Sequence, residues 1–229
     1  MTSNKRLDMY SSRKEDLRCL YNKYQSDFKN IVQRFPSDDL GGPFLMSPNS
    51  DYYKQRNPLL VVGQETFGWE KHIDDLFKQM TVYEDFNVGE NYLSSPFWNV
   101  IRKVEVALEN QPYSCAWTNV SKFDQNSGRP DEEHQYEICS LDHILAEEIK
   151  ILRPKFCLFF TSHRYDERLR NIFTGAEFVK VDNQPLNQIS KIKHPLLPKF
   201  TMRAYHPRYL RMRGLEDNFI KVIKSITKE

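Results

Sequence analysis

The sequence predicts an α/β fold: a three-layer α/β/α sandwich with a central, mostly parallel four-stranded sheet and an N-terminal helical extension. Short apolar runs, typical of buried strands, alternate along the chain with longer segments whose apolar residues recur at helical spacing. A helix between successive strands favours parallel pairing, because a parallel connection has to cross over the sheet. The chain has 229 residues, 39% of them hydrophobic, which suffices for one domain of this kind.

The N-terminal part is predicted to be helical. Over residues 12–35, large apolar side chains fall on one helix face, and Pro36 ends the pattern. Residues 36–58 are rich in glycine, proline and asparagine, which predicts a loop. We therefore expect a helix-and-loop extension over residues 1–50, followed by the α/β domain over residues 51–229.

The elements of the domain follow in alternation. Continuous apolar runs predict four strands, at residues 59–62, 113–120, 155–161 and 178–181. Apolar residues at helical spacing predict helices over residues 70–80, 96–108, 132–152, 165–173 and 215–226. Asp131 is suited to cap one of these helices, since a carboxylate accepts hydrogen bonds from the free amides of a helix start. Residues 199–205 form a further extended segment.

Composition limits the classes of protein to which the chain can belong. No apolar run approaches the roughly 18 residues of a transmembrane helix, and the start of the chain lacks the apolar core of a secretory signal. None of the four cysteines lies in a CxxC pair, which favours free thiols in a reducing compartment over a metal or disulfide site. We expect a cytoplasmic monomer without a membrane partner.

The basic residues are unevenly distributed, although the net charge is only +2. Residues 183–215 contain no acid, and their basic side chains are Lys191, Lys193, Lys199, Arg203, Arg208, Arg211 and Arg213. A block of one charge sign beside a candidate site favours binding of a polyanion. A basic loop that is merely solvated is the alternative interpretation.

Polar residues follow three of the predicted extended segments. The first strand runs into Gly63-Gln64-Glu65, the second ends near Asn119, and His206-Pro207 follows residues 199–205. In open α/β sheets, function gathers at the carboxyl ends of the strands. A carboxylate and a histidine that face each other there would suit hydrolysis, in which a base and a group that stabilises negative charge cooperate.

Together these segments resemble the uracil-DNA glycosylase superfamily. Gly63-Gln64-Glu65-Thr66-Phe67 is similar to its first motif, Gly-Gln-Asp-Pro-Tyr, and Asn119 matches its strand-end asparagine. His206-Pro207-Arg208-Tyr209-Leu210 is similar to its last motif, His-Pro-Ser-Pro-Leu. Residues 95–101 resemble the Phe-Trp helix start of the mismatch-specific and single-strand-selective branches, and residues 130–154 resemble the long helix between the second and third strands. The order of motifs holds over roughly residues 55–227.

The chain also departs from the family pattern. Glu65 replaces the aspartate or asparagine of the first motif, and Thr66 replaces the proline that usually follows. The third strand ends in Thr161-Ser162-His163, where related enzymes often have a glycine. The paired cysteines of the iron–sulfur branches are absent, so the resemblance implies no cluster. These differences leave the activity open.

The chemistry of N-glycosidic cleavage suggests roles for the two catalytic candidates. Cleavage builds positive charge on the sugar and negative charge on the leaving base. Glu65 is suited to stabilise the sugar cation and orient water, and His206 is suited to donate a hydrogen bond to the base. The alternatives are a glutamate that caps a helix and a histidine that packs in the core.

Five further side chains are candidates for base recognition. The amides of Gln64 and Asn119 can read a base edge, because an amide carries a donor and an acceptor in one plane. For Asn119 the alternative is a hydrogen bond within its own turn. Phe67, Trp69 and Phe97 are candidate surfaces on which an extruded base stacks, although large aromatic residues more often pack in a core.

Contacts to the DNA strand are expected from the loops. Leu210 is the candidate wedge that fills the gap left by an extruded base, and burial in the core is the alternative. Candidate contacts to phosphate are Lys122, Arg129, Arg208, Arg211 and Arg213, with plain solvation as the alternative.

The leading hypothesis is a DNA-binding N-glycosylase that removes uracil or another altered base by hydrolysis, from single- or double-stranded DNA, without metal or cofactor. The main alternative is a non-catalytic nucleic-acid-binding module on the same fold, which the change from aspartate to Glu65 favours. A second alternative is a hydrolase of small nucleosides or nucleotides. The basic block at 183–215 disfavours it, because a small ligand needs no extended positive surface.

Overall fold

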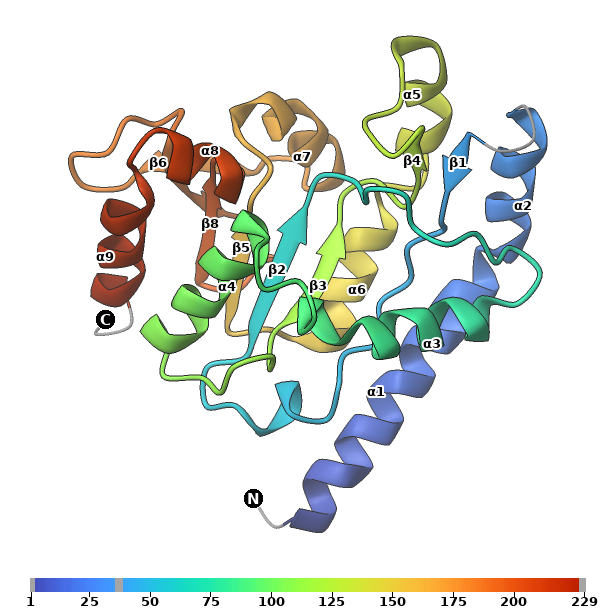
Figure 1. The fold of residues 1–229 in the computed structure, drawn as a ribbon, viewed down its shortest axis with the longest axis horizontal. Coiled ribbons are helices and arrows are strands. Elements are labelled where there is room, and N and C mark those ends of the chain that lie inside the picture. The colour runs from blue at the N-terminus through green and yellow to red at the C-terminus, as the bar shows by residue number, and fades with distance from the viewer. Residues whose placement is uncertain (1–2, 36–38, 227–229) are drawn as a thin grey trace.

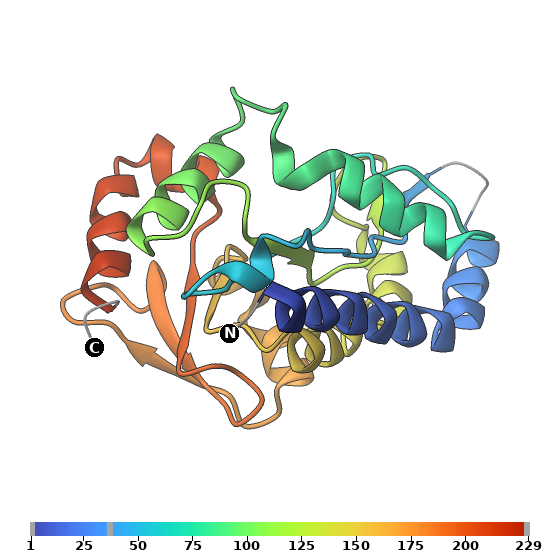
Figure 2. The same cartoon turned by 90° about the horizontal axis from the view of Figure 1, so that it is seen from below.

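The computed structural model describes residues 3–35 and 39–226, and it has an α/β architecture with helices on both faces of a mixed sheet (Figures 1 and 2). In chain order the elements are α1 (Ser3–Lys23), α2 (Gln25–Arg34), β1 (Leu40–Gly41), η1 (Tyr52–Lys54), β2 (Leu59–Gly63), α3 (Leu76–Phe86), η2 (Asn87–Gly89), α4 (Pro96–Ala107), β3 (Ala116–Asn119), β4 (Asp124–Gln125), α5 (Glu132–Cys139), α6 (Ile144–Leu152), β5 (Phe156–Phe159), η3 (His163–Tyr165), α7 (Asp166–Ile172), β6 (Glu177–Lys180), β7 (Ile189–Lys193), β8 (Phe200–Ala204), α8 (Pro207–Met212) and α9 (Glu216–Ile226).

The central sheet has six strands, in the order β3-β2-β5-β8-β7-β6, so the expected four-stranded sheet is wrong in number. The strands β3, β2, β5 and β8 are parallel, whereas β7 runs antiparallel to both β8 and β6. The segment at 199–205 therefore supplies the fourth parallel strand, and β6 lies at the edge. The strand β7 was not expected, because its sequence, ISKIK, carries two lysines.

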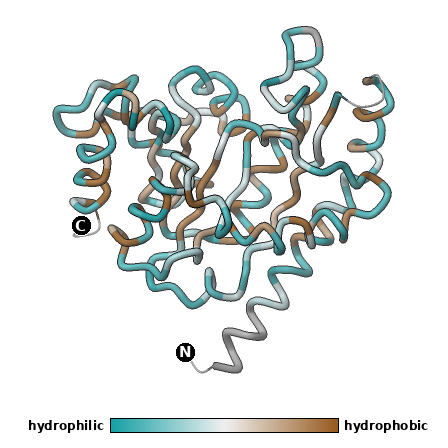
Figure 3. Tube along the Cα trace, in the orientation of Figure 1, coloured by the Kyte–Doolittle hydropathy of each residue, from teal (hydrophilic) through white to brown (hydrophobic). Residues whose placement is uncertain are grey.

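The three neighbouring strands β2, β3 and β5 are buried along their whole length. This explains their continuous apolar sequences, since a parallel strand covered on both faces has no solvent side. Figure 3 shows hydrophobic residues along these strands and hydrophilic ones in most of the surrounding loops. Gly63 lies opposite Asn119, and Val62 lies opposite Phe159, so the carboxyl ends of these strands lie together along one side of the sheet, which we call the strand edge.

Helices of different sequence cover the two faces. On one face, α4 packs against α8 and α9, and on the other α6 contacts α1 (Figure 2). The N-terminal helices are joined to the domain, because the Tyr21 hydroxyl donates a hydrogen bond to Glu148 of α6 over 2.9 Å, and Leu17 and Phe28 belong to the common core. Within the described residues, no helix has the length and apolar character that a membrane crossing requires.

Two expected helices are each broken into two. The helix expected over residues 12–35 is interrupted at Tyr24, whose amide bonds the carbonyl of Tyr21, three residues back. The helix expected over residues 132–152 is interrupted between α5 and α6, where successive amides bond carbonyls three residues back. Both breaks tighten the chain locally, and periodicity alone does not reveal them. The second break lets Asp142 turn toward Arg168.

The helix expected over residues 70–80 begins later, at Leu76. Asp75 caps it by accepting a hydrogen bond from the amide of Lys78. The expected cap of the later helix at Asp131 is confirmed, because its carboxylate accepts the amide of His134 over 2.9 Å. The late start of α3 leaves a long irregular segment between β2 and α3.

A buried ion pair joins the sheet to the helices on the α6 face. The ammonium of Lys122 lies 2.7 Å from the nearer carboxylate oxygen of Glu148, and both side chains are fully buried. Thr118 and Tyr21 also donate hydrogen bonds to this carboxylate. Burial lowers the pKa of Lys122, and the charge of Glu148 acts in the opposite direction.

Removing one member of this pair is expected to destabilise the fold strongly. Glu148→Ala leaves the Lys122 ammonium buried without its counter-charge, and we expect it to cost about 3–5 kcal/mol in the free energy of unfolding measured by urea denaturation. The control is Glu147→Ala on the same helix, since that partly exposed carboxylate accepts a bond from Tyr24 and should cost about 1 kcal/mol or less. Equal losses in the two variants would contradict a dominant role of the pair.

Candidate active site

The strand ends that carry the candidate residues lie at one edge of the sheet. Glu65 follows β2, Asn119 ends β3, and His206 follows β8. These parallel strands belong to one run of neighbours, β3-β2-β5-β8, so their carboxyl ends share an edge (Figure 1). The three residues therefore lie at the carboxyl ends of neighbouring parallel strands, although Glu65 contacts Tyr165 and His206 contacts Phe97, so the two do not face each other directly.

The amide of Asn119 is buried at this edge without a hydrogen-bonding partner. The residue is 1% exposed, and neither its Nδ2 nor its Oδ1 is paired with any described residue. The side chain lies over Gly63, where an added Cβ would come within 2.2 Å of Oδ1. Glycine is therefore required at this strand end, because any larger residue would displace the amide. The indole Nε1 of the adjacent Trp117 is also buried and unpaired.

Aromatic side chains extend from Asn119 toward His206. The ring of Phe97, in the first turn of α4, is 6.2 Å from that of Trp117 and 5.5 Å from that of His206. The rings of Phe97 and His206 are stacked, with an interplanar angle of 27°. Asn119, Trp117, Phe97 and His206 thus form a continuous wall on the α4 side of the sheet edge, which we call the aromatic wall.

His206 is held as a neutral hydrogen-bond donor. Its Nδ1 accepts the amide hydrogen of Arg208 over 3.2 Å and so caps α8. Because Nδ1 is an acceptor, the neutral ring carries its hydrogen on Nε2. Burial, followed by the positive charge of Arg208, lowers the pKa of His206 to about 4. The second His-Pro pair differs, because His194 uses both ring nitrogens in local bonds, to Thr174 and Leu196.

The carboxylate of Glu65 is turned toward α7. Its Oε2 accepts a hydrogen bond from the Tyr165 hydroxyl. Burial raises the pKa of Glu65, whereas the Tyr165 hydroxyl and the charges of Arg168 and Arg129 act to lower it. Arg168 is itself fixed by two hydrogen bonds to Asp142 and one to Ser121. The carboxylate thus accepts a hydrogen bond from Tyr165 and is influenced by two arginines, on the α7 side of the strand ends.

The other residues of the first motif have structural contacts. The amide nitrogen of Gln64 donates to the carbonyl of Thr161 over 2.9 Å, which ties the end of β2 to the end of β5. Trp69 packs against Phe44, Phe86 and Trp117 and donates to Gln79. The expected base-reading role of Gln64 and stacking role of Trp69 are therefore not favoured, because both side chains are engaged within the fold.

Phe67 does not line the site. Its side chain is 88% exposed, whereas Phe97 is the member of the expected aromatic set that contacts His206. The segment that carries Phe67 is held by Asp124, whose carboxylate accepts hydrogen bonds from the Thr66 hydroxyl and from the amides of Gly68 and Trp69.

Two of the expected DNA contacts are wrong. Lys122 is fully buried in its pair with Glu148, so its ammonium does not reach the surface. Leu210 is 1% exposed and packs in the core from α8, so it is not the exposed wedge. The apolar face of a short helix that the sequence did not predict accounts for its burial.

The basic block at 183–215 does not form one surface. Arg208, Arg211 and Arg213 lie exposed on or directly after α8, beside His206. Lys193 ends the antiparallel strand β7 and Lys199 precedes β8, so both lie at the other end of the strands. Arg203 is buried and paired with Asp166. Arg211 pairs with Glu216, and Arg213 lies over the ring of Tyr209. The charge of Arg208 lowers the pKa of His206, and the charges of Arg168 and the exposed Arg129 act to lower that of Glu65.

The residues that sequence reasoning missed lie after β3 and β5. Tyr165, Arg168 and Asp124 hold Glu65 or its loop, and Trp117 adds an unpaired donor. Polar residues directly after the third predicted strand were the available signal for Tyr165. Among the described residues, no group of three or more histidine, cysteine or acidic side chains is arranged to hold a metal ion.

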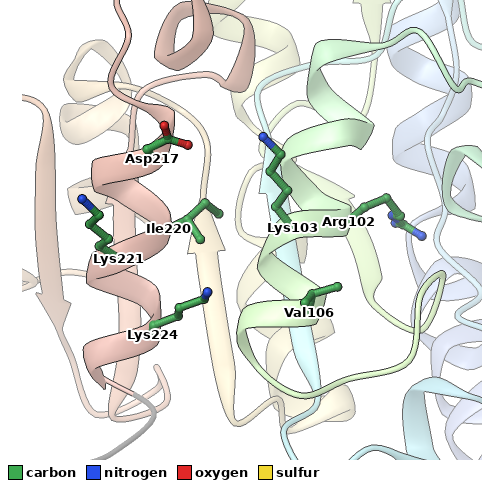
Figure 4. Close-up of a pocket in the computed structure, with 7 residues that line it drawn as sticks. All are labelled: Arg102, Lys103, Val106, Asp217, Ile220, Lys221 and Lys224. Atoms are coloured by element: carbon green, nitrogen blue, oxygen red, sulfur yellow. The ribbon is translucent and has the colours of Figure 1, made fainter.

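A separate groove of about 530 Å³ lies between α4 and α9, away from the strand ends (Figure 4). Ile220 and Lys224 of α9 extend toward α4, whereas Arg102 points away from α9. Lys103 pairs with Glu216, and Arg102 lies 3.1 Å from the buried Glu105. Because Lys103 and Arg102 already have acidic partners, these two cations favour an anion in the groove less than their charges suggest.

Comparison with known proteins adds no assignment: no family model matches the chain, and no curated protein matches it significantly.

The low pKa of His206 predicts a specific pH dependence of stability. The folded ring stays neutral down to about pH 4, whereas the unfolded chain takes up the proton near pH 6.5, so the unfolded state gains protons first as the pH falls. Between pH 7 and pH 5 the wild type should lose about 2 kcal/mol more than His206→Asn, measured by urea denaturation. Parallel losses in the two proteins would show that the ring protonates freely in the folded state.

Proposed function

We propose that the protein is a DNA N-glycosylase that binds an extruded uracil-like or otherwise altered base at the aromatic wall and releases it by hydrolysis. The observation that carries the proposal is the buried, unpaired amide of Asn119. A buried polar group without a partner costs stability, so its retention in this position calls for a ligand that pairs with it.

A nucleobase has the chemistry that this amide lacks. The amide offers one acceptor and two donor hydrogens in a plane, and a uracil-like base presents a ring N–H beside carbonyl oxygens. Phe97 supplies an aromatic face near the amide, on which an extruded base can stack. The indole Nε1 of Trp117 is a further donor at the same place.

The two catalytic groups fit the charges that develop during cleavage. When the bond between C1′ and the base nitrogen breaks, its electron pair leaves with the base, and the Nε2–H of His206 donates a hydrogen bond to the resulting anion. The carboxylate of Glu65 stabilises the positive sugar and accepts a proton from the water that adds to C1′. Arg208 and Arg129 are exposed cations, and in this proposal they contact the flanking phosphates.

The fold component of the proposal is the three-layer α/β/α sandwich of the uracil-DNA glycosylase superfamily. The four parallel strands β3, β2, β5 and β8 would form its sheet, with β7 and β6 as an addition at one edge.

A binding module without catalysis is the second candidate, and the hydrogen bond from Tyr165 to Glu65 favours it. That bond occupies one carboxylate oxygen on the side away from the aromatic wall. If it persists when DNA is bound, the carboxylate does not reach the sugar and the protein binds without releasing a base.

The unpaired amide leads to a prediction that separates function from stability. Asn119→Leu preserves the size of the side chain and removes its polar atoms, so we expect the free protein to gain about 1 kcal/mol or more in the free energy of unfolding. The same change should reduce the affinity for uracil-containing DNA and base release at least tenfold. The measurements are urea denaturation, fluorescence anisotropy and alkaline strand cleavage. A loss of stability in this variant would mean that the amide is paired within the protein.

The chemical role of Glu65 is tested by two conservative changes. Glu65→Gln keeps the shape and the bond to Tyr165 but removes the charge, so base release should be abolished while DNA affinity stays nearly unchanged. Glu65→Asp shortens the side chain by one methylene and restores the residue of the motif that the chain resembles. Because positioning errors near 1 Å cost about a hundredfold in rate, this variant should keep or raise the activity on uracil. Strand cleavage at uracil in single- and double-stranded DNA measures both. Equal base release by wild type and Glu65→Gln would exclude Glu65 as the catalytic carboxylate, and no release by wild type would leave the binding module.

A further inference from the structure

Phe67 is a large aromatic residue that the fold holds out of its core. Its side chain is 88% exposed, although both of its neighbours in the chain are fixed. Thr66 and Gly68 each donate a hydrogen bond to the carboxylate of Asp124, and so does the next amide, at Trp69. The ring therefore extends from an anchored turn rather than from a loose loop.

The turn is further restricted by close packing around it. Gly68 adopts a φ of +72°, and a Cβ at this position would lie 2.9 Å from the Ser127 hydroxyl oxygen. A Cβ on Gly41 would lie within 2.7 Å of both the Trp69 carbonyl and the Asp124 carboxylate. Two glycines thus allow neighbouring segments to pack closely against the Phe67 turn, which the bonds to Asp124 anchor.

The position of Phe67 relates it to the candidate active site. It lies two residues after Glu65, and Ser127, which contacts the turn, lies two residues before the exposed Arg129. Arg129 in turn lies over the ring of Tyr165, the residue that bonds Glu65. An exposed ring and an exposed guanidinium therefore occur together near the Glu65 side of the strand edge.

We propose that Phe67 stacks on an unpaired nucleobase of the DNA strand, next to the nucleotide whose base is held at Asn119. A rigid, exposed aromatic face is a stacking platform that accepts any base, and ordering it on binding costs little because its backbone is already fixed. Arg129 neutralises the phosphate between the two nucleotides. This inference rests on the proposed function in requiring DNA as the ligand, but it does not require catalysis.

This role of Phe67 differs from the expectation that Phe67, Trp69 and Phe97 stack on the extruded base while Leu210 fills the gap it leaves. Phe97 supplies the stacking face at the aromatic wall, and Leu210 is buried, so neither contacts the base beside the extruded one. Phe67 is the exposed aromatic side chain of the first motif and therefore fills that role.

The test uses a single-stranded oligonucleotide with a uracil and, at the adjacent position, the fluorescent base 2-aminopurine. Binding of wild type should quench 2-aminopurine through stacking, and Phe67→Ala should abolish the quenching and raise the Kd about tenfold. The slope of log Kd against log salt should not change, because no charge is removed. Phe67→Trp should restore both signals. The matched control is Tyr136→Ala, since Tyr136 is 86% exposed but lies on α5, and it should behave as wild type.

The outcomes separate this inference from the proposed function. If Phe67→Ala and Tyr136→Ala both bind and quench as wild type does, the stacking role is overturned, whether or not base is released. If binding depends on Phe67 but no base is released, the stacking role stands and the glycosylase proposal fails. If wild type binds no DNA at low salt, both are overturned.

Discussion

The candidate site depends on the carboxylate of Asp124, which is fully buried and binds the segment after β2 at three points. The residue lies in β4, which pairs with β1 so that Gly41 faces Asp124, and the absence of a side chain at Gly41 leaves room for the carboxylate. Through this one residue, the backbone pairing of β4 with β1 and the three bonds of the carboxylate join the N-terminal segment, the loop after β3 and the loop after β2. Three hydrogen bonds to one buried side chain fix a loop that has no regular structure of its own.

The parallel sheet places the amide of Asn119 and the carboxylate of Glu65 on different sides of the strand ends. Along β3, Trp117 and Asn119 point toward α4, whereas Thr118 between them bonds Glu148 of α6. The amide and the aromatic wall therefore lie on one side of the strand ends, and the carboxylate of Glu65 and its donors lie on the side of α7. A ligand that uses both groups has to lie across the strand ends, and in the proposed function its base would lie on one side and its sugar above the strand ends. An extruded nucleotide has that shape.

Much of this arrangement follows from the sequence, and the rest depends on tertiary contacts. The strands β2, β3 and β5 and the placement of Glu65, Asn119 and His206 at strand ends are predictable, because continuous apolar runs followed by polar turns are local signals. The strand β7 and the burial of Leu210 are not, since a lysine-rich strand is specified by its neighbours. The exposure of Phe67 and the burial of Lys122 are not predictable for the same reason, because they are decided by Asp124 and Glu148, which are distant in the chain.

The two catalytic candidates are shifted in opposite directions by their surroundings. Burial raises the pKa of Glu65 and lowers that of His206, because it disfavours the charged form of each. The positive charge of Arg208 acts on His206 in the same direction as burial, so the ring favours its neutral form. Glu65 has Tyr165, Arg168 and Arg129, all of which favour the carboxylate. A bound nucleotide that excludes water strengthens each of these interactions, since charges interact more strongly at low dielectric constant. The longer side chain of glutamate is what lets the carboxylate lie among these donors, and its reach toward the sugar then depends on how readily it leaves Tyr165.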